Sequence, residues 1–368
     1  MSSLPIPLTS DEKLVKKNIF WYDKKMRYFI TAVALLLVST VFADESSPIK
    51  SPEQIQAELD QAEKQFHKAE EMFNPWYAGP LVTGGAKNMP KGSMVFFPYN
   101  SFIDNYAVWN SERKSISIPN RYVFNPQPGA FQTGITDWLD AILIFQGFGK
   151  WQKDKASGGF GDMTVGIGIP ILKEGLHRPA LRFVFNETFP TGRYQKLNPN
   201  LLGLDSSGGG SYVSQFGLRL SKLTFWSHKH PTNFRLAYSY SIPSEVHVRG
   251  FNSYGGGYGA SGTVHPGHAQ QADAAVEYSF TQKWVFACDL VYNWVEKTTF
   301  HGNPGVLKNG ALSLVGNGSN DQLSLAPAIE YNPNANLNFV GGVWFDLYGR
   351  NSTRFITGIL VVNYIFKL

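Results

Sequence analysis

The residues that could do chemistry are charged groups in segments where polar and apolar side chains alternate. They lie on the polar faces of these segments. Three arginines fall on consecutive segments and five carboxylates on the segments that follow: Arg182, Arg219, Arg235, Asp273, Glu277, Asp289, Glu330 and Asp346. If these faces line one lumen, a basic wall opposes an acidic wall, and the field between them would orient dipolar solutes and select ions by charge. Alternatively, the groups pair with one another and fill a narrow interior. The sequence leaves both open.

The segments that carry these groups have a two-residue period. In residues 271–280 apolar side chains alternate with polar ones, Asp273 and Glu277 among them. Such alternation is typical of strands with one apolar and one polar face. The apolar face is rich in aromatic side chains. We therefore expect that face to contact lipid and the polar face to line the lumen. The same pattern occurs in residues 234–241, 284–294 and 323–331.

The connections between these strands alternate in length. Short ones lie near residues 135–138, 173–178, 227–231, 281–283 and 332–336, and long ones at 150–158, 191–210, 246–268 and 300–320. Short turns at one end and long loops at the other are typical of bacterial outer-membrane barrels. The sequence therefore predicts an all-β fold, an antiparallel transmembrane β-barrel of about 12 strands in residues 76–368, with a short N-terminal helix. The first pair is expected at residues 94–108 and 122–134.

Composition supports this class and argues against others. Only 17% of the residues are charged, against about a quarter in soluble domains, and there are 27 Phe, 17 Tyr and 9 Trp. The mean hydropathy of −0.19 is too low for a helical membrane bundle. The net charge of +5 is dispersed, which disfavours nucleic acid as a partner. Cys288 is the one cysteine, so no internal disulfide is expected.

Residues 1–43 read as an N-terminal extension and signal peptide. The basic residues Lys24, Lys25 and Arg27 precede a short apolar run that ends at Ala43 before Asp44, the predicted cleavage site. A membrane anchor is the alternative, but the run is short for a span. Because Met26 opens the signal pattern, translation could start there instead of at Met1. Export would place the barrel in the outer membrane of a Gram-negative bacterium.

Residues 44–75 are expected to contain a periplasmic amphipathic helix. Ser51 is a suitable N-cap, Pro52 fits the first turn and Gln54 completes a capping box. Apolar residues follow at spacings of three and four. The helix at residues 51–73 could self-associate weakly, or it could rest on the end of the barrel.

The last strand, residues 355–368, places Tyr364, Phe366 and Leu368 on one face. This pattern resembles the C-terminal signal that outer-membrane proteins present to the barrel assembly machinery, although it ends on Leu instead of an aromatic residue. We therefore expect that machinery and outer-membrane lipid as partners.

The Gly-rich loop of residues 250–268 has two alternative interpretations. It could fold inward as a constriction, with Tyr254 and Tyr258 as stacking surfaces, or it could be a mobile outer loop, which its ordering entropy favours. The histidine pairs at 265 and 268 and at 228 and 230 lack an identifiable third ligand, so neither a metal nor another cofactor is expected.

Three stretches carry a resemblance to a known family. They are WYAGPLVT at residues 76–83, FQTGITDWLD at 131–140 and FGD at 160–162. The chain resembles the bacterial outer-membrane proteins associated with the meta-cleavage pathway of phenol degradation, over roughly residues 76–368. The resemblance implies a barrel that moves small, hydrophobic or aromatic compounds, and it implies no catalytic residues.

These patterns favour a porin-like function, the passage of small solutes. We expect no enzyme activity. A barrel enzyme of the lipase or protease type is one alternative, with the Gly/Ser loop at residues 204–208 or Asp162 as candidate groups, but the sequence holds no G-x-S-x-G motif. A structural or adhesive surface protein is another. Conductance, lipid hydrolysis and pull-down experiments would separate the three.

Overall fold

The structure is a computed structural model that describes residues 51–73, 77–225 and 230–368. The predicted signal peptide, with its cleavage site at Ala43 and Asp44, lies outside these residues, as does His228. No helix among the described residues has the length and apolar character needed to cross a membrane.

One helix precedes the strands, α2 (Pro52–Phe73). Ser51 caps it as predicted: its hydroxyl accepts a hydrogen bond of 3.3 Å from the Gln54 N–H, and the Gln54 side chain accepts one of 3.0 Å from the Ser51 N–H. This reciprocal pair satisfies two backbone donors that a helix start leaves free. Ile55 and Leu59, on the predicted apolar face, are exposed.

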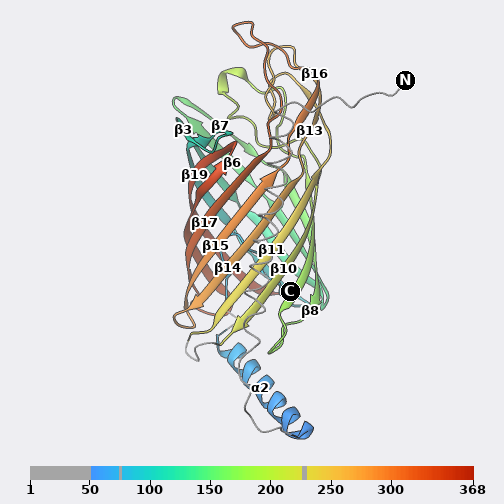
Figure 1. Cartoon of the computed structure of the whole chain (residues 1–368), viewed down its shortest axis with the longest axis vertical. Coiled ribbons are helices and arrows are strands. Elements are labelled where there is room, and N and C mark those ends of the chain that lie inside the picture. Colours follow the sequence, from blue (N-terminus) through green and yellow to red (C-terminus); the bar gives the residue numbers. More distant parts are fainter. Residues whose placement is uncertain (1–50, 74–76, 226–229) are drawn as a thin grey trace, which may run out of the picture. The chain divides into compact units, whose positions relative to one another are not determined.

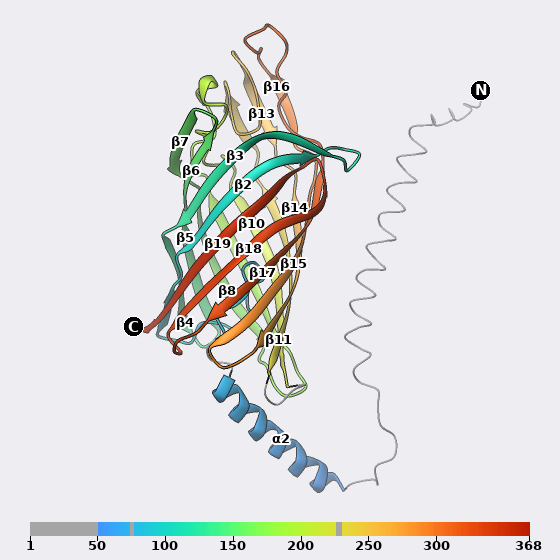
Figure 2. The same ribbon diagram turned by 90° about the vertical axis from the view of Figure 1, so that its left-hand side faces the viewer.

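The predicted all-β barrel is confirmed. Within the described residues, sixteen strand segments form one antiparallel sheet that closes on itself, because β1 pairs with both β4 and β19. Four successive pairs of segments are separated by only one or two residues, which gives twelve continuous strands. Figures 1 and 2 show the strands tilted around a single barrel.

The four interrupted strands are the first four of the barrel. They are β1 (Ser93–Phe96) with β2 (Tyr99–Trp109), β3 (Ser115–Gln127) with β4 (Gly129–Thr136), β5 (Leu139–Phe145) with β6 (Gly147–Gln152), and β7 (Lys155–Phe160) with β8 (Met163–Leu172). Pro98 and Pro128 lie at two of the breaks, where a missing N–H cannot continue the ladder. The predicted first pair is therefore longer than expected and divided.

The other eight strands are continuous. They are β9 (Ala180–Phe189), β10 (Val213–Thr224), β11 (Thr232–Pro243), β14 (Ala269–Ser279), β15 (Trp284–Val295), β17 (Asn320–Tyr331), β18 (Leu337–Arg350) and β19 (Ser352–Lys367). In β14 the polar residues Asp273, Glu277 and Ser279 are buried, whereas their apolar neighbours are partly exposed. The polar face of the predicted alternation is therefore the inner face of the barrel.

The predicted long connections differ from expectation in two ways. Residues 150–158 are not a loop, because β6 and β7 pair from Gly147 with Phe160 to Gln152 with Lys155 and leave only a tight turn. The connections at residues 246–268 and 300–320 hold a small second sheet of β12 (Val246–Arg249), β13 (Ser261–His265) and β16 (Thr299–Asn303). A short 3-10 helix, η1 (Pro199–Leu201), lies in the connection between β9 and β10.

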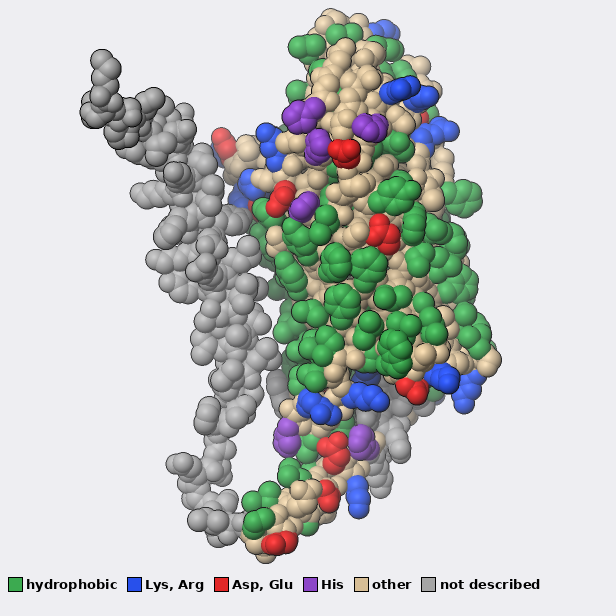
Figure 3. Space-filling model, turned by 90° about the vertical axis from the view of Figure 1, so that its right-hand side faces the viewer, with side chains coloured by type: hydrophobic (Ala, Val, Ile, Leu, Met, Phe, Trp, Pro, Cys, Tyr) green, Lys and Arg blue, Asp and Glu red, His purple; other side chains and the backbone are tan. Residues whose placement is uncertain are grey.

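The outer wall is apolar. Figure 3 shows a band of hydrophobic side chains on one face of the barrel, with most charged side chains above and below it. Exposed members of the wall include Phe216, Leu218, Ile329, Leu360 and Tyr364. So large an exposed apolar surface marks contact with lipid or a partner.

Candidate functional site

Residues 77–92 form a separate segment inside the barrel, which we call the lumen segment. Pro80 and Pro90, with glycines at 79, 84, 85 and 92, prevent regular structure, so its backbone N–H groups need acceptors from elsewhere. Its partners lie on strands around the circumference, including β5, β8, β15, β17 and β19. Only a chain within the lumen can contact all of these strands at once.

Inner-face carboxylates supply the acceptors. The Ala78 N–H donates to Glu330 over 2.9 Å, and the Val82 and Thr83 N–H groups donate to the two oxygens of Asp289 over 3.2 and 2.8 Å. Both carboxylates are fully buried. These oxygens accept backbone N–H groups that an irregular segment leaves without an internal partner, so the two side chains fix the first half of the segment.

A third carboxylate, Asp140 on β5, was not among the predicted site residues. It accepts a hydrogen bond of 2.9 Å from the Met89 N–H and forms an ion pair with Arg182. Every other residue of β5 is apolar, so the strand has no two-residue alternation that would have marked Asp140 as an inner-face residue. Its position beside a short turn gave no signal either.

Apolar packing holds the middle of the segment. Leu81 is 6% exposed and lies among small and branched inner-face residues: Ala287, Ala326, Ala328, Val340, Ile359 and Val361. The alanines leave room for this one larger side chain. Tyr99 adds a hydrogen bond of 3.3 Å from its hydroxyl to the Leu81 carbonyl.

The three predicted arginines have different surroundings. Arg235 forms a two-pronged ion pair with Glu277, with contacts of 2.6 and 2.8 Å, and Arg182 pairs with Asp140. Arg219 forms no ion pair within the part of the chain that is described, and its guanidinium packs on Gly84. A Cβ atom at position 84 would lie 2.5 Å from that guanidinium, so the glycine permits the approach.

Arg219 and Asp273 border a cavity of about 90 Å³ beside the lumen segment. The Asp273 carboxylate accepts a hydrogen bond of 2.9 Å from Gln271. Arg182 and Arg235 therefore pair with carboxylates, whereas Arg219 of β10 and Asp273 of β14 border the cavity with Ala237 of β11 between them. The predicted field across the lumen stays a prediction.

Asp346 lies apart from this cluster. Its carboxylate accepts hydrogen bonds from the Trp109 indole at 2.7 Å, from Arg354 at 3.1 Å and from the Phe355 N–H at 2.9 Å. These contacts join β2, β18 and β19, so the residue stabilises the wall where the register of β19 shifts between Arg354 and Phe355.

Tyr254 and Tyr258 lie in the connection between β12 and β13. The Tyr254 hydroxyl donates to the Gly209 carbonyl over 2.7 Å, and burial raises its pKa to about 12. Tyr258 is half exposed and packs edge-on against Phe251, with ring centres 5.1 Å apart. Their predicted role in a constriction stays a prediction.

Of the two histidine pairs, the one at residues 265 and 268 has protein groups as its partners. His268 shares a hydrogen bond of 2.6 Å with the Tyr240 hydroxyl, and His265 lies 3.9 Å from Glu245. In the described ranges, no group of three or more His, Cys, Asp or Glu side chains could hold a metal ion. Ser206 of the Gly/Ser loop shares a hydrogen bond of 2.7 Å with Ser253.

Of the comparisons with known proteins, the one with solved structures bears on the fold. No protein-family model matches the chain, and no curated protein is similar to it in sequence. An outer-membrane channel of Pseudomonas putida F1 superposes with a TM-score of 0.55 at 13% identity, over 77% of this chain and 98% of the channel. At this identity, the similarity shows a barrel like that of an outer-membrane channel.

Two further solved structures are similar at lower scores. The Pseudomonas putida toluene transporter TodX has a TM-score of 0.37 at 12% identity, over 80% of this chain and 96% of that one. The β domain of the Bordetella autotransporter BrkA has a TM-score of 0.39 at 9% identity, over 73% and 99%. Scores this low carry no argument about function.

Proposed function

We propose that this protein is an outer-membrane channel for small solutes and that the lumen segment controls the width of its path. The observation that carries the proposal is the set of hydrogen bonds from Ala78, Val82, Thr83 and Met89 to carboxylates of the inner wall. They join a chain with no regular structure to a closed barrel that has an apolar exterior. A wall of this kind encloses a path, and the segment occupies it.

The remaining space sets the size of solute that can pass without rearrangement. The cavity beside Arg219 measures about 90 Å³, whereas sites for small organic molecules usually measure about 300–1,000 Å³. We infer that ions and water pass the segment as it stands, and that larger solutes require it to shift. The resemblance of residues 76–83, 131–140 and 160–162 to the phenol-degradation family favours hydrophobic or aromatic compounds as those solutes.

Export and insertion belong to the same proposal. Cleavage between Ala43 and Asp44 would release the mature chain into the periplasm, and Tyr364, Phe366 and Leu368 would engage the barrel assembly machinery. Tyr364 on β19 and Leu368 directly after it are exposed. The helix α2 leaves Ile55 and Leu59 exposed, which supports weak self-association through residues 51–73.

Liposome swelling tests the proposal. Purified protein is inserted into vesicles, which are diluted into solutions of neutral solutes of increasing size. The proposal expects swelling with the smallest solutes and a sharp decline as solute volume grows. Vesicles with protein that swell no faster than empty vesicles for every solute would contradict it.

A further inference from the structure

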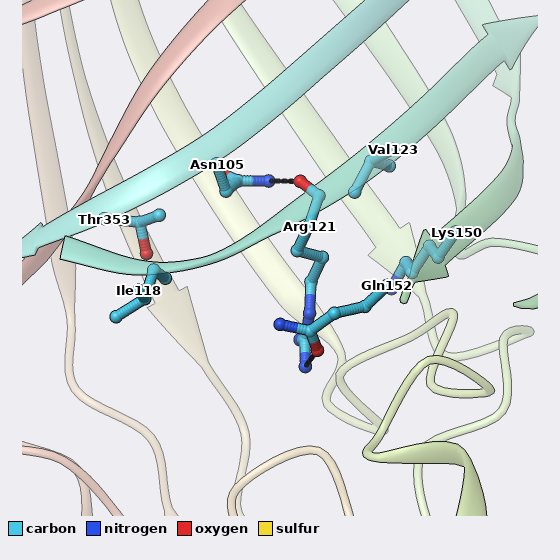
Figure 4. Close-up of a pocket in the computed structure, with 7 residues that line it drawn as sticks. All are labelled: Asn105, Ile118, Arg121, Val123, Lys150, Gln152 and Thr353. Carbon is cyan, nitrogen blue, oxygen red and sulfur yellow. Dashed lines mark hydrogen bonds between the residues drawn. The ribbon is translucent and has the colours of Figure 1, made fainter. Parts of the chain in front are cut away.

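A second and larger cavity lies at the end of the barrel where the long connections are. It measures about 430 Å³ and is bordered by residues of β2, β3, β6 and β19, shown in Figure 4: Asn105, Ile118, Arg121, Val123, Lys150, Gln152 and Thr353. Its volume falls within the usual range of about 300–1,000 Å³ for sites that hold small organic molecules.

The cavity is on the inner side of the wall. Tyr122 and Trp151, the neighbours of Arg121 and Lys150 in sequence, stack on each other with ring centres 5.8 Å apart. They pack together with Phe102, which is 45% exposed on the outer face. Because successive side chains of a strand point to opposite faces, Arg121 and Lys150 point inward.

In the described part of the chain, no carboxylate pairs directly with the two cations of the cavity, although buried Asp205 acts on Lys150 from beyond ion-pair distance. Arg121 donates to the Leu202 carbonyl over 2.9 Å and reaches the Gln152 amide oxygen at 3.4 Å, and Lys150 donates to the Ser206 carbonyl. These acceptors are neutral. No carboxylate lies within ion-pair distance of either cation among the residues that the structure describes, in contrast to Arg182 and Arg235.

Two partly buried cations favour an anion between them, since a charge-assisted contact offsets their desolvation. Ile118 and Val123 add an apolar surface to the same cavity. A fully hydrated inorganic anion gains nothing from that surface, whereas an organic carboxylate can place its charged end at Arg121 and Lys150 and its apolar body against Ile118 and Val123.

We propose that this cavity is a binding site for small organic carboxylates with a compact apolar body. In so far as the bound anion is a transported solute, the inference rests on the proposed channel function, and it narrows the solute class. The site would collect such anions at the long-loop end, above the lumen segment that restricts their further passage.

Equilibrium dialysis of radiolabelled benzoate against the full chain in nonionic detergent tests the site, with empty micelles as the blank. We expect saturable binding that inorganic phosphate and benzyl alcohol displace poorly. Arg121→Gln with Lys150→Gln should weaken it at least about tenfold, because two charge-assisted contacts are lost. Lys153→Gln removes one positive charge from the exposed turn of the hairpin that carries Lys150 and should leave binding unchanged.

Both cations also donate hydrogen bonds to carbonyls of the connection between β9 and β10. The neutral pair removes these bonds too, so a second variant is needed to attribute the loss of binding to the lost charge. The exchanged pair, Arg121→Lys with Lys150→Arg, keeps both positive charges and both sets of N–H donors, and should bind benzoate more tightly than the neutral pair. No saturable binding, stronger binding of phosphate than of benzoate, or equal loss in the exchanged and neutral pairs would overturn the proposal.

The outcome is separable from that of the channel. Swelling with small neutral solutes but no benzoate binding would refute the site and leave the channel function intact. Benzoate binding that depends on Arg121 and Lys150, in a protein that passes no solute, would support the site and refute the channel function.

Discussion

The Asp289 carboxylate accepts a hydrogen bond of 2.8 Å from the Thr83 N–H, across a separation of 206 residues. This bond joins the inner wall to a chain that precedes the first strand, and it is one of several of its kind. Because an irregular segment has no internal ladder, its position depends on such contacts. Weakening them should loosen the segment while the barrel stays intact.

Asp289→Asn should loosen residues 82 and 83. The amide side chain has one acceptor oxygen in place of two, so one of the two N–H groups loses its partner, a change worth about 1–3 kcal/mol when buried. We expect hydrogen exchange of the Val82 and Thr83 amides to quicken by at least about tenfold, measured by mass spectrometry. Asp137→Asn, at an exposed turn, is the control; equal exchange in both variants would argue against the role of Asp289.

Gly84→Val should displace the Arg219 guanidinium. A Cβ at this position would lie 2.5 Å from it, and overpacking of this kind costs about 1–3 kcal/mol. Urea unfolding in vesicles, followed by Trp fluorescence, should show a lower midpoint for the valine variant. Adding Arg219→Ala should restore most of the loss. If the double variant is no more stable than Gly84→Val alone, the contact between the two residues is not the cause.

Glu277→Gln should destabilise the barrel, because it leaves the buried Arg235 without its counter-charge. Breaking a buried pair from one side costs about 3–5 kcal/mol, whereas replacing both partners by apolar residues is often nearly neutral. The same urea titration should therefore rank Glu277→Gln below the double variant Arg235→Met with Glu277→Leu. Glu245→Gln, at an exposed carboxylate, should match the original chain. The reverse ranking would contradict the assignment.

Arg219→Gln should shift ion selectivity towards cations, since Arg219 is the predicted lumen arginine without an ion pair in the described structure. A change in the reversal potential across a salt gradient in planar bilayers measures the shift. Neutralising both members of the Arg182–Asp140 pair as well should add little to the shift, because that pair carries no net charge. Arg178→Gln, at an exposed turn, serves as control. Unchanged selectivity on loss of Arg219 would refute a field across the lumen.

The sequence was sufficient to predict the barrel, because alternation is a local signal that each strand repeats. It was also sufficient to select Asp289 and Glu330 as inner-face residues by their place in that alternation. The sequence did not predict which groups these carboxylates bind. Their partners in residues 77–92 have no periodicity, and they come into contact with the carboxylates only in the closed barrel. The strand breaks at Pro98 and Pro128 and the small sheet of β12, β13 and β16 depend on similarly distant pairings.

The central claim is that the lumen segment limits flow through the barrel, and single-channel conductance in planar bilayers tests it most directly. The full chain is compared with the double variant Asp289→Asn with Glu330→Gln, which weakens the contacts to Ala78, Val82 and Thr83. The account predicts small, discrete openings for the original chain and larger or longer openings for the variant. Equal conductance in two correctly folded proteins, or no openings in either, would contradict it.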